Sequence, residues 1–527
     1  MGSEKKARTE TKRNRIIDWA VFAVLLGAAS AVTFLLFYRQ TLGNSQWYPS
    51  DMEAYILEMQ GLESKYSFPY PVFFKFAALL HLFMGPELSV ALATMLLNSL
   101  GMALTKLAFN HIALEKLENA LGRERQLQER EGEGRGAMAG GRSLSWLAGI
   151  LISLAAVSLF FISMLYPPKG HYLPGIRFRY VGVFSANPFH NATYMAARPF
   201  TILAFLWFAK LLPIYERGPR SRRALSEAGK AKGAQSAQAL ESAGGQGPAI
   251  SDYVFFSIFL LAATMTKPSF TLVMVSAAGL LMLCRLFRSR FRNFIPTVLL
   301  GLCFVPTFLD LLYQYSGVFV PQEGQERGVG FCLGEVWAAY CDSIPLAACL
   351  AVGFPLLVLV LNYKEWKRDS LFRFSWLLYL AGLAEAFLLY EKGFRKWDFN
   401  FSWGYMCGVF FCHFGALALL LQVTAARVGM IRRKAGRREA SGAEVREGES
   451  GVCQASGAEV RERESGVCRV PGPEVREGES RVCRASESES ATRWAFALLA
   501  LQWLAYLWHV LCGIAYFASL MSGATYY

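Results

Sequence analysis

The sequence lacks the cysteine patterns that hold metal ions or carry redox chemistry. It has eleven cysteines and six histidines, but no CxxC pair and no cysteine–histidine run with metal-ligand spacing. Six of the cysteines lie in apolar segments, where we interpret them as small packing residues. Cys332 and Cys341 alone share a predicted exterior loop, a compartment that permits a disulfide. The sequence therefore demands neither a metal ion nor a cofactor.

Charged residues are scarce over several long stretches. The segment Ile16–Tyr38 contains a single acid, Asp18, at its start. About 18 or more consecutive apolar residues are enough for a helix to cross the ~30 Å hydrocarbon core of a membrane. Several later windows have the same character. The sequence therefore predicts an all-α, polytopic integral membrane protein and excludes an ordinary soluble domain.

The chain carries a formal net charge of +14. In a soluble protein this charge would suggest nucleic-acid binding, but here the basic residues cluster beside apolar segments, as the positive-inside rule describes. We therefore expect no nucleic-acid partner, and we place the basic tail, residues 1–15, in the cytoplasm. The first apolar segment continues too far for a cleaved signal peptide, so we expect it to remain as a membrane anchor.

Placing every basic loop in the cytoplasm predicts about eleven transmembrane helices. Residues 16–425 form the predicted transmembrane core, with a first exterior loop at 39–87 that carries short helices. Cytoplasmic linkers are predicted at 110–143 and 213–250. The apolar piece Val72–Met84 is too short to cross the membrane, so we expect it to be re-entrant or interfacial.

A repeated unit occupies the last polar interval. Residues 426–493 contain three copies of a 15-residue unit, which begin at Ser441, Ser456 and Pro471. The unit has few apolar residues and many charges, so it cannot bury enough apolar surface to offset the cost of ordering the chain. We predict a disordered cytoplasmic insertion without a catalytic part. Residues 494–527 are predicted to be the last transmembrane helix and an exterior C-terminus.

Two carboxylates stand in the first exterior loop, Asp51 and Glu53, bracketed by aromatic residues and prolines. A positioned carboxylate can take the proton of a poorly nucleophilic hydroxyl as a bond forms, which is the work of a general base. The alternative is helix capping, because Ser, Asp and Glu are favoured at the start of a helix. Ser50 is itself a candidate cap, which would leave Asp51 free.

Basic residues in exterior segments run against the positive-inside bias. Lys267 stands in a three-residue turn between two apolar helices, at the depth of lipid headgroups, and lysine binds phosphate. The alternative is that Lys267 only extends to the interface. Other candidate substrate-binding residues lie in two further exterior segments: His190, Asn191, Tyr194, Arg198, Glu391, Arg395, Asp398 and Trp403.

Two of the titratable residues leave alternatives open. His190 is either a ligand or acid–base group, or a hydrogen-bonded structural residue beside aromatics. Glu385 lies inside an apolar span, where acids are costly and face a polar interior. Its carboxyl either belongs to a proton path or pairs with another helix.

The layout of the first 310 residues resembles that of polytopic glycosyltransferases of the GT-C fold. In particular, it is similar to the protein-mannosyltransferase and aminoarabinose-transferase-like branch, whose first loop carries an Asp or Glu followed by a tyrosine, here Asp51 and Tyr55. The segment Tyr70-Pro71-Val72-Phe73-Phe74 stands where that branch has His-Pro-Pro, without the histidine. The turn Thr266-Lys267-Pro268 looks like the Thr-Lys turn that contacts lipid phosphate in that branch.

The resemblance implies transfer of a sugar from a polyprenyl-phosphate-linked donor to an acceptor on the extracytoplasmic face of a bacterial cell membrane. Asp51 would be the general base and Glu53 a helper. The donor phosphate would be held by Lys267, Arg198 and Arg395, and a sugar would stack on Trp403 or Tyr194. The partners implied are membrane lipid and the lipid-linked sugar.

Two other functions remain open at this point. A glycan polymerase or ligase on a related scaffold would need a large exterior loop late in the chain, and Ser316–Ser343 is only moderate in size. A transporter or flippase for a lipid-linked or polar substrate would be typical of paired repeats with broken helices, which the sequence does not display. Glu385 is the residue that favours a transporter.

Overall fold

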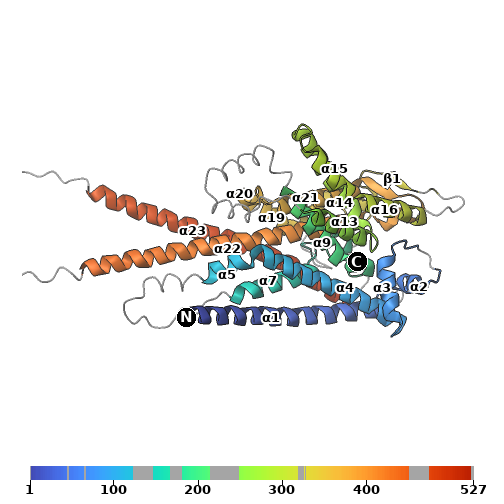
Figure 1. Ribbon diagram of the computed structural model, residues 1–527, viewed down its shortest axis with the longest axis horizontal. Helices are drawn as coiled ribbons and strands as arrows, with labels where there is room; N and C mark the ends of the chain where they lie inside the picture. The colour runs from blue at the N-terminus through green and yellow to red at the C-terminus, as the bar shows by residue number, and fades with distance from the viewer. Residues whose placement is uncertain are drawn as a thin grey trace, which may run out of the picture.

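The computed structural model of the chain is built mostly from helices. It describes residues 2–43, 47–63, 67–122, 146–166, 178, 181–213, 249–318, 326, 328–449 and 474–523. In this part of the chain, six helices contain a stretch long and apolar enough to cross a membrane: α1 (Gly2–Thr41), α4 (Pro86–Phe109), α14 (Ser269–Arg288), α21 (Ser370–Leu388), α22 (Ser402–Glu449) and α23 (Glu474–Met521). The helix α1 packs against α4, and α22 against α23 (Figure 1).

Two further apolar segments are bent pairs of helices. The pair α15 (Phe294–Leu302) and α16 (Val305–Val318) bends by 43°, and the pair α18 (Ile344–Ala351) and α19 (Gly353–Leu361) bends by 70°. If each pair is one span, the described residues hold eight candidate spans. An all-α, multi-pass membrane architecture is therefore confirmed.

The number of eleven spans stays a prediction. Three of the segments predicted to cross contain helices of only 13 to 15 residues: α7 (Trp146–Ser158), α9 (Arg198–Leu211) and α13 (Ile250–Thr264). Fifteen residues of helix extend only about 22 Å. These three helices are therefore shorter than the roughly 30 Å hydrocarbon core of a membrane, and their length does not qualify them as candidate spans.

The centre of the bundle is α22, whose apolar stretch is 94% buried. It packs most extensively against α21, and the two backbones approach closely at glycines. A methyl group at Gly382 would lie 2.9 Å from the Cα atom of Tyr405, and one at Gly408 would lie 2.8 Å from the Cα atom of Tyr379. Small residues at such crossings allow close packing where water supplies no hydrophobic driving force between helices.

The short elements gather at one end of the bundle, called the loop end here: α2 (Met52–Gln60), α3 (Pro71–His81), η3 (Val181–Phe184), α8 (Ala192–Ala196), α17 (Glu335–Ala338) and η4 (Gly393–Asp398). Figure 1 shows α2, α3 and the strand β1 (Val329–Phe331) at the end of the molecule away from the N-terminus. The remaining short helices are η1 (Asn110–Leu114), α5 (Glu115–Gly122), η2 (Leu159–Phe161) and α20 (Tyr363–Trp366).

A small sheet at the loop end has no counterpart in the sequence analysis. Strand β1 (Val329–Phe331) pairs antiparallel with β2 (Leu389–Glu391), and Val329 lies opposite Glu391. The sheet joins the loop after α16 to the end of α21, so it fixes the position of the segment that leads into η4. Cys332 and Cys341 are buried nearby as free thiols rather than as a disulfide.

Helix extends into both ends of the segment 426–493 that we predicted to be disordered. Helix α22 continues to Glu449, and α23 begins at Glu474. These flanks are rich in Ala, Arg and Glu, which have high helix propensity, so their composition favours helix even without a buried face. Residues 450–473, and with them the whole second repeat, lie outside the described residues, as do 123–145 and 214–248 of the predicted linkers.

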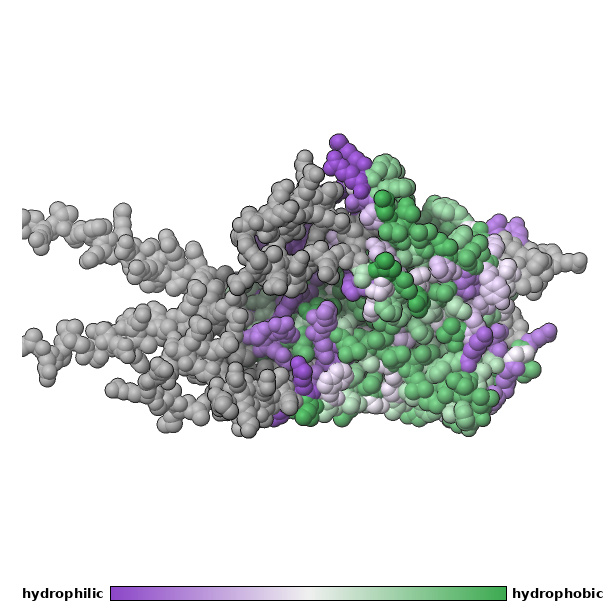
Figure 2. Space-filling model, in the orientation of Figure 1, coloured by the Kyte–Doolittle hydropathy of each residue, from purple (hydrophilic) through white to green (hydrophobic). Residues whose placement is uncertain are grey.

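The surface of the bundle is apolar. Figure 2 shows predominantly hydrophobic residues over the helices, with hydrophilic residues gathered toward the ends. Leu79, Phe83 and Phe308 are examples of large apolar side chains that are more than half exposed. Apolar patches this extensive are not typical of soluble monomers, and a membrane would cover them.

Candidate functional site

The carboxylate of Asp51 points into the loop end instead of capping α2. The hydroxyl of Ser50 accepts a hydrogen bond from the Met52 amide at 3.3 Å, and the Asp51 side chain makes no cap bond. Its Oδ2 atom accepts hydrogen bonds from the hydroxyl of Tyr55 at 3.2 Å and from Nδ2 of Asn191 at 2.8 Å. Of the two readings of Asp51, the structure thus favours the one in which Ser50 caps the helix.

Asn191 holds the carboxylate from the other side of the site. Its Oδ1 atom accepts hydrogen bonds from the Tyr194 amide and from the Thr193 hydroxyl, both at 2.9 Å, so it caps α8. Because Oδ1 is committed to the cap, the amide nitrogen faces Asp51. The geometry that caps α8 therefore directs a hydrogen-bond donor at Asp51, which lies 140 residues earlier in the sequence.

Lys267 reaches the same network from the turn between α13 and α14. Its Nζ atom donates to the Thr193 hydroxyl at 3.4 Å, and that oxygen lies 3.3 Å from the Tyr55 hydroxyl. Three consecutive contacts, none longer than 3.4 Å, therefore join Asp51 to Lys267 through Tyr55 and Thr193. Lys267 is only 8% exposed, so it is turned inward rather than extended to the interface.

Aromatic rings surround the ammonium group of Lys267. The Nζ atom lies 4.6 Å from the ring centroid of Trp403 and 5.9 Å from that of Tyr70. The Trp403 ring also lies 5.3 Å from the ring of His190 and 5.7 Å from that of Tyr194. Cation–π contacts such as the two made by Lys267 stabilise a partly desolvated cation by about 0.5–2 kcal/mol each.

The segment from β2 to the start of α22 forms the remaining wall. Glu391 accepts a hydrogen bond from Nδ2 of Asn400 at 2.8 Å and pairs with Arg395 at 3.1 Å. Arg395 also lies 3.5 Å from Asp398. Trp403 donates its Nε1 hydrogen to Asn400 at 3.3 Å, so this charged wall holds the tryptophan against Lys267.

Burial shifts the pKa values of the central groups, in each case in favour of the neutral form. It raises the pKa of Asp51, and the Lys267 charge and the two hydrogen bonds oppose this shift. Burial lowers the pKa of Lys267 to about 8, opposed by the charge of Asp51. Burial and the neighbouring Lys267 charge lower the pKa of His190 to about 3, so its imidazole is neutral at physiological pH.

Nine of the eleven predicted site residues meet at the loop end: Asp51, His190, Asn191, Tyr194, Lys267, Glu391, Arg395, Asp398 and Trp403. They come from four separate segments of the chain. Their convergence is a structural fact, whereas their roles stay predictions.

The other two predicted residues lie elsewhere. Glu53 is exposed on α2, and no contact between described residues joins it to Asp51. Arg198 is buried behind Tyr194: its guanidinium group donates to the Ala186 carbonyl, lies 3.3 Å from Oδ1 of Asn187 and stacks 3.5 Å from the Phe410 ring centroid. The guanidinium group therefore has protein partners of its own, and its role as a phosphate ligand stays a prediction.

Sequence reasoning did not single out Thr193, which links three of the site residues. Its hydroxyl contacts Asn191, Tyr55 and Lys267. The signal was the local pattern Asn191-Ala192-Thr193-Tyr194, in which an N-cap asparagine is followed by a threonine two residues later. Among the described residues, no group of three or more His, Cys, Asp or Glu side chains could hold a metal ion.

No protein family model, no curated protein and no solved structure matches this chain. The geometry of the loop end therefore carries the functional argument.

Proposed function

We propose that the protein is a membrane glycosyltransferase that moves a sugar from a polyprenyl-phosphate-linked donor to an acceptor at the loop end. One observation carries the proposal: a half-buried carboxylate, Asp51, and a buried ammonium, Lys267, are joined by three short contacts beside an aromatic wall. The pair lies at one end of an apolar helix bundle, where a membrane lipid presents its head group.

Asp51 has the properties of a general base. Both of its hydrogen bonds go to Oδ2, and among the described contacts Oδ1 receives none, so this atom is available to an acceptor hydroxyl. Proton transfer is most efficient when the pKa of the base lies near the working pH, and burial moves the pKa of Asp51 in that direction.

Lys267 has the properties of a phosphate ligand. With a pKa of about 8 its ammonium group is protonated at neutral pH, and among the described residues only one of its three hydrogens is directed at a protein oxygen, that of Thr193. A phosphate oxygen would give this buried cation a charge-assisted hydrogen bond, in addition to its attraction through space to Asp51 and Glu391.

The connection between the first loop and the lysine turn supports a common site. The Val72 amide at the start of α3 donates to the Met265 carbonyl at the end of α13, at 3.0 Å. The short apolar helix therefore ties the Asp51 loop to the Lys267 turn. This arrangement agrees with the resemblance of Asp51, Tyr55 and the Lys267 turn to the GT-C glycosyltransferases.

The test separates chemistry from binding. In Asp51→Asn, turnover of a prenyl-phosphate-linked sugar should fall by about a hundredfold to ten-thousandfold, while donor binding stays near that of the parent. In Lys267→Ala, donor binding should weaken instead. Glu53→Gln is the matched control, because this exposed carboxylate lies outside the network. Parent-like turnover of Asp51→Asn would refute the assignment of the base.

A transporter or flippase is the second candidate. The two bent pairs, α15–α16 and α18–α19, are broken helices of the kind that often form transport sites. At the break before α19, the Phe354 amide donates a hydrogen bond to Nε2 of His509 at 3.1 Å, so this freed backbone donor already has a partner within the protein. Uptake or lipid scrambling in proteoliposomes without any sugar transfer would favour this candidate over the transferase.

A further inference from the structure

A cavity of about 470 Å³ lies between α14, the bent pair α15–α16 and α21. This volume falls within the range of about 300–1,000 Å³ that is typical of small-molecule sites. None of the residues in its wall belongs to the Asp51–Lys267 network. The cavity is therefore a separate feature whose occupant must be inferred from its own chemistry.

The wall of the cavity is apolar apart from one pair. The hydroxyl of Ser276 donates to Oε1 of Glu385 at 2.6 Å, so the two polar side chains in the wall are bonded to each other. The other side chains in the wall are aliphatic or aromatic. Apolar cavities of this kind exclude water and take up hydrocarbon.

The cavity opens on the outer surface of the bundle. Its wall residues Leu272, Val275 and Phe308 are 38%, 42% and 58% exposed. Helix α14 is a candidate membrane span, so this surface faces lipid. The occupant therefore enters from the membrane, as the chain of a lipid does, rather than from water.

One end of the cavity adjoins the site. Phe401 in its wall is two residues from Trp403, and Leu389 is two residues from Glu391. Gly404 lies beside both the cavity and the site: a methyl group there would lie 2.6 Å from Cγ2 of Val273, 3.3 Å from Oε2 of Glu385, and 3.4 Å from the carbonyl oxygen of Ser269, two residues after Lys267. A hydrocarbon chain in the cavity and an anion bound at Lys267 would therefore lie on either side of Gly404.

We infer that this cavity binds the hydrocarbon chain of a prenyl phosphate whose phosphate contacts Lys267. One cavity beside one cation suits a lipid with a single chain and a terminal phosphate better than a two-chain phospholipid. The inference rests on the proposed function, because it gives the binding place of the donor's chain. It adds the prediction that the surface of α14, α16 and α21 selects the lipid.

The experiment uses the full-length protein in nanodiscs and a prenyl phosphate with a photoreactive group on its chain. Val275→Trp fills the mouth of the cavity, and Gly301→Trp fills its floor, where the nearest other atom to an added Cβ is Met282 Cε at 3.9 Å. Val24→Trp is the control, because Val24 is 72% exposed on α1 and lies outside the cavity. Circular dichroism and size-exclusion profiles establish that the variants fold.

In the parent and in Val24→Trp, the probe should label peptides of α14, α16 and α21, and an unlabelled long-chain prenyl phosphate should compete. Filling the cavity should reduce this labelling and the affinity for the long-chain lipid by about tenfold, while a two-isoprene analogue binds as to the parent. Equal labelling of all variants, labelling spread over α1, or equal competition by an anionic phospholipid would overturn the inference.

The outcome is independent of catalysis. If the cavity selects the prenyl chain but no variant or parent transfers sugar, the proposed transferase fails and the lipid site stands. If Asp51→Asn abolishes turnover while the filled cavity has no effect on donor affinity, the transferase stands and the lipid site fails.

Discussion

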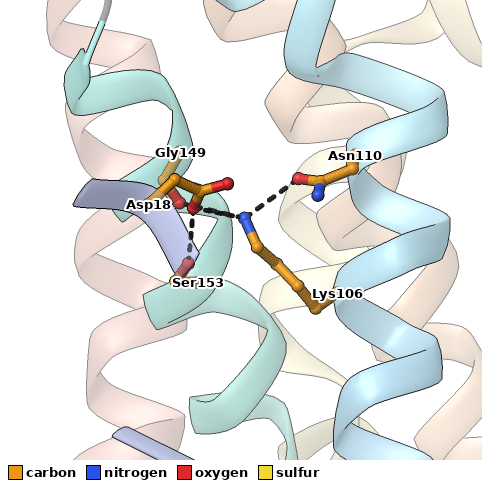
Figure 3. Close-up of polar contacts among 5 residues, drawn as sticks. All are labelled: Asp18, Lys106, Asn110, Gly149 and Ser153. Atoms are coloured by element: carbon orange, nitrogen blue, oxygen red, sulfur yellow. Dashed lines mark hydrogen bonds and ion pairs between the residues drawn. The ribbon is translucent and has the colours of Figure 1, made fainter. Parts of the chain in front are cut away.

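Removing the buried charge of Lys106 should destabilise the bundle more than removing any single charge on its surface. The Nζ atom of Lys106 donates to Oδ1 of Asp18 at 2.6 Å, to Oδ1 of Asn110 at 3.0 Å and to the Gly149 carbonyl at 3.3 Å (Figure 3). Ser153 donates to the same carboxylate oxygen at 3.0 Å. The cluster ties α1, α4 and α7 together.

The magnitude follows from burial. The side chain of Lys106 is 0% exposed and that of Asp18 is 7% exposed. Breaking a buried ion pair by removing one partner costs about 3–5 kcal/mol, because the other charge stays buried without compensation. Lys106→Met keeps the length of the side chain and removes its charge, so it should lower the free energy of unfolding by about that amount. The double variant Asp18→Asn/Lys106→Met should lose less than the sum of the two single variants.

The assay is thermal unfolding of the purified protein in detergent, followed by tryptophan fluorescence. A loss of 3–5 kcal/mol should lower Tm on the order of 10 °C. Lys116→Met is the matched control: Lys116 donates to Oε1 of Gln422 at 2.6 Å, but in an exposed position. Exposed interactions of this kind contribute about 0–1 kcal/mol. Equal Tm values for the two lysine variants, or additive losses in the double variant, would refute the reasoning.

Two further predictions concern pH and orientation. In the proposed mechanism, turnover requires Asp51 ionised and Lys267 protonated. Turnover should therefore fall as pH drops through the raised pKa of Asp51 and as pH rises above about 8, the pKa of Lys267. Tyr55→Phe removes a hydrogen bond that lowers the pKa of Asp51, so the acid limb of a pH–rate profile should move to higher pH. Cysteine labelling of intact cells from outside should miss the cysteines of the repeats if the basic loops are cytoplasmic, and efficient labelling would reverse the predicted orientation: Cys453, Cys468 and Cys483.

The sequence predicts a multi-pass membrane protein and the hairpin that presents Lys267. Both depend on the length, composition and order of residues within one short stretch of chain. A long apolar window needs only its own length and composition to become a span candidate. Likewise Pro268 and the short interval between two apolar segments predict the turn, which the structure has between α13 and α14. Pro71 predicts the start of a helix, and α3 begins there.

Other features depended on the partner that each segment meets. The bends at Cys303 and Val352 divide stretches that are uniformly apolar. Pro306 and Pro355 stand in the first turn of each second half, where proline breaks a helix, but the sequence does not give the angles of 43° and 70°. The pairing of β1 with β2 brings together segments about 60 residues apart, so no local pattern announces it.

For the site, the sequence by itself determined which polar residues stand at the ends of apolar segments, because that follows from the order of residues along the chain. Only the tertiary structure decided which of them meet. Asp51 and Glu53 are two residues apart and equally acidic, yet Asp51 faces Asn191 and Glu53 is exposed, because neighbouring side chains on α2 and its cap point in different directions. Arg198 is buried, so its guanidinium group bonds to the polar atoms packed around it, among them Oδ1 of Asn187.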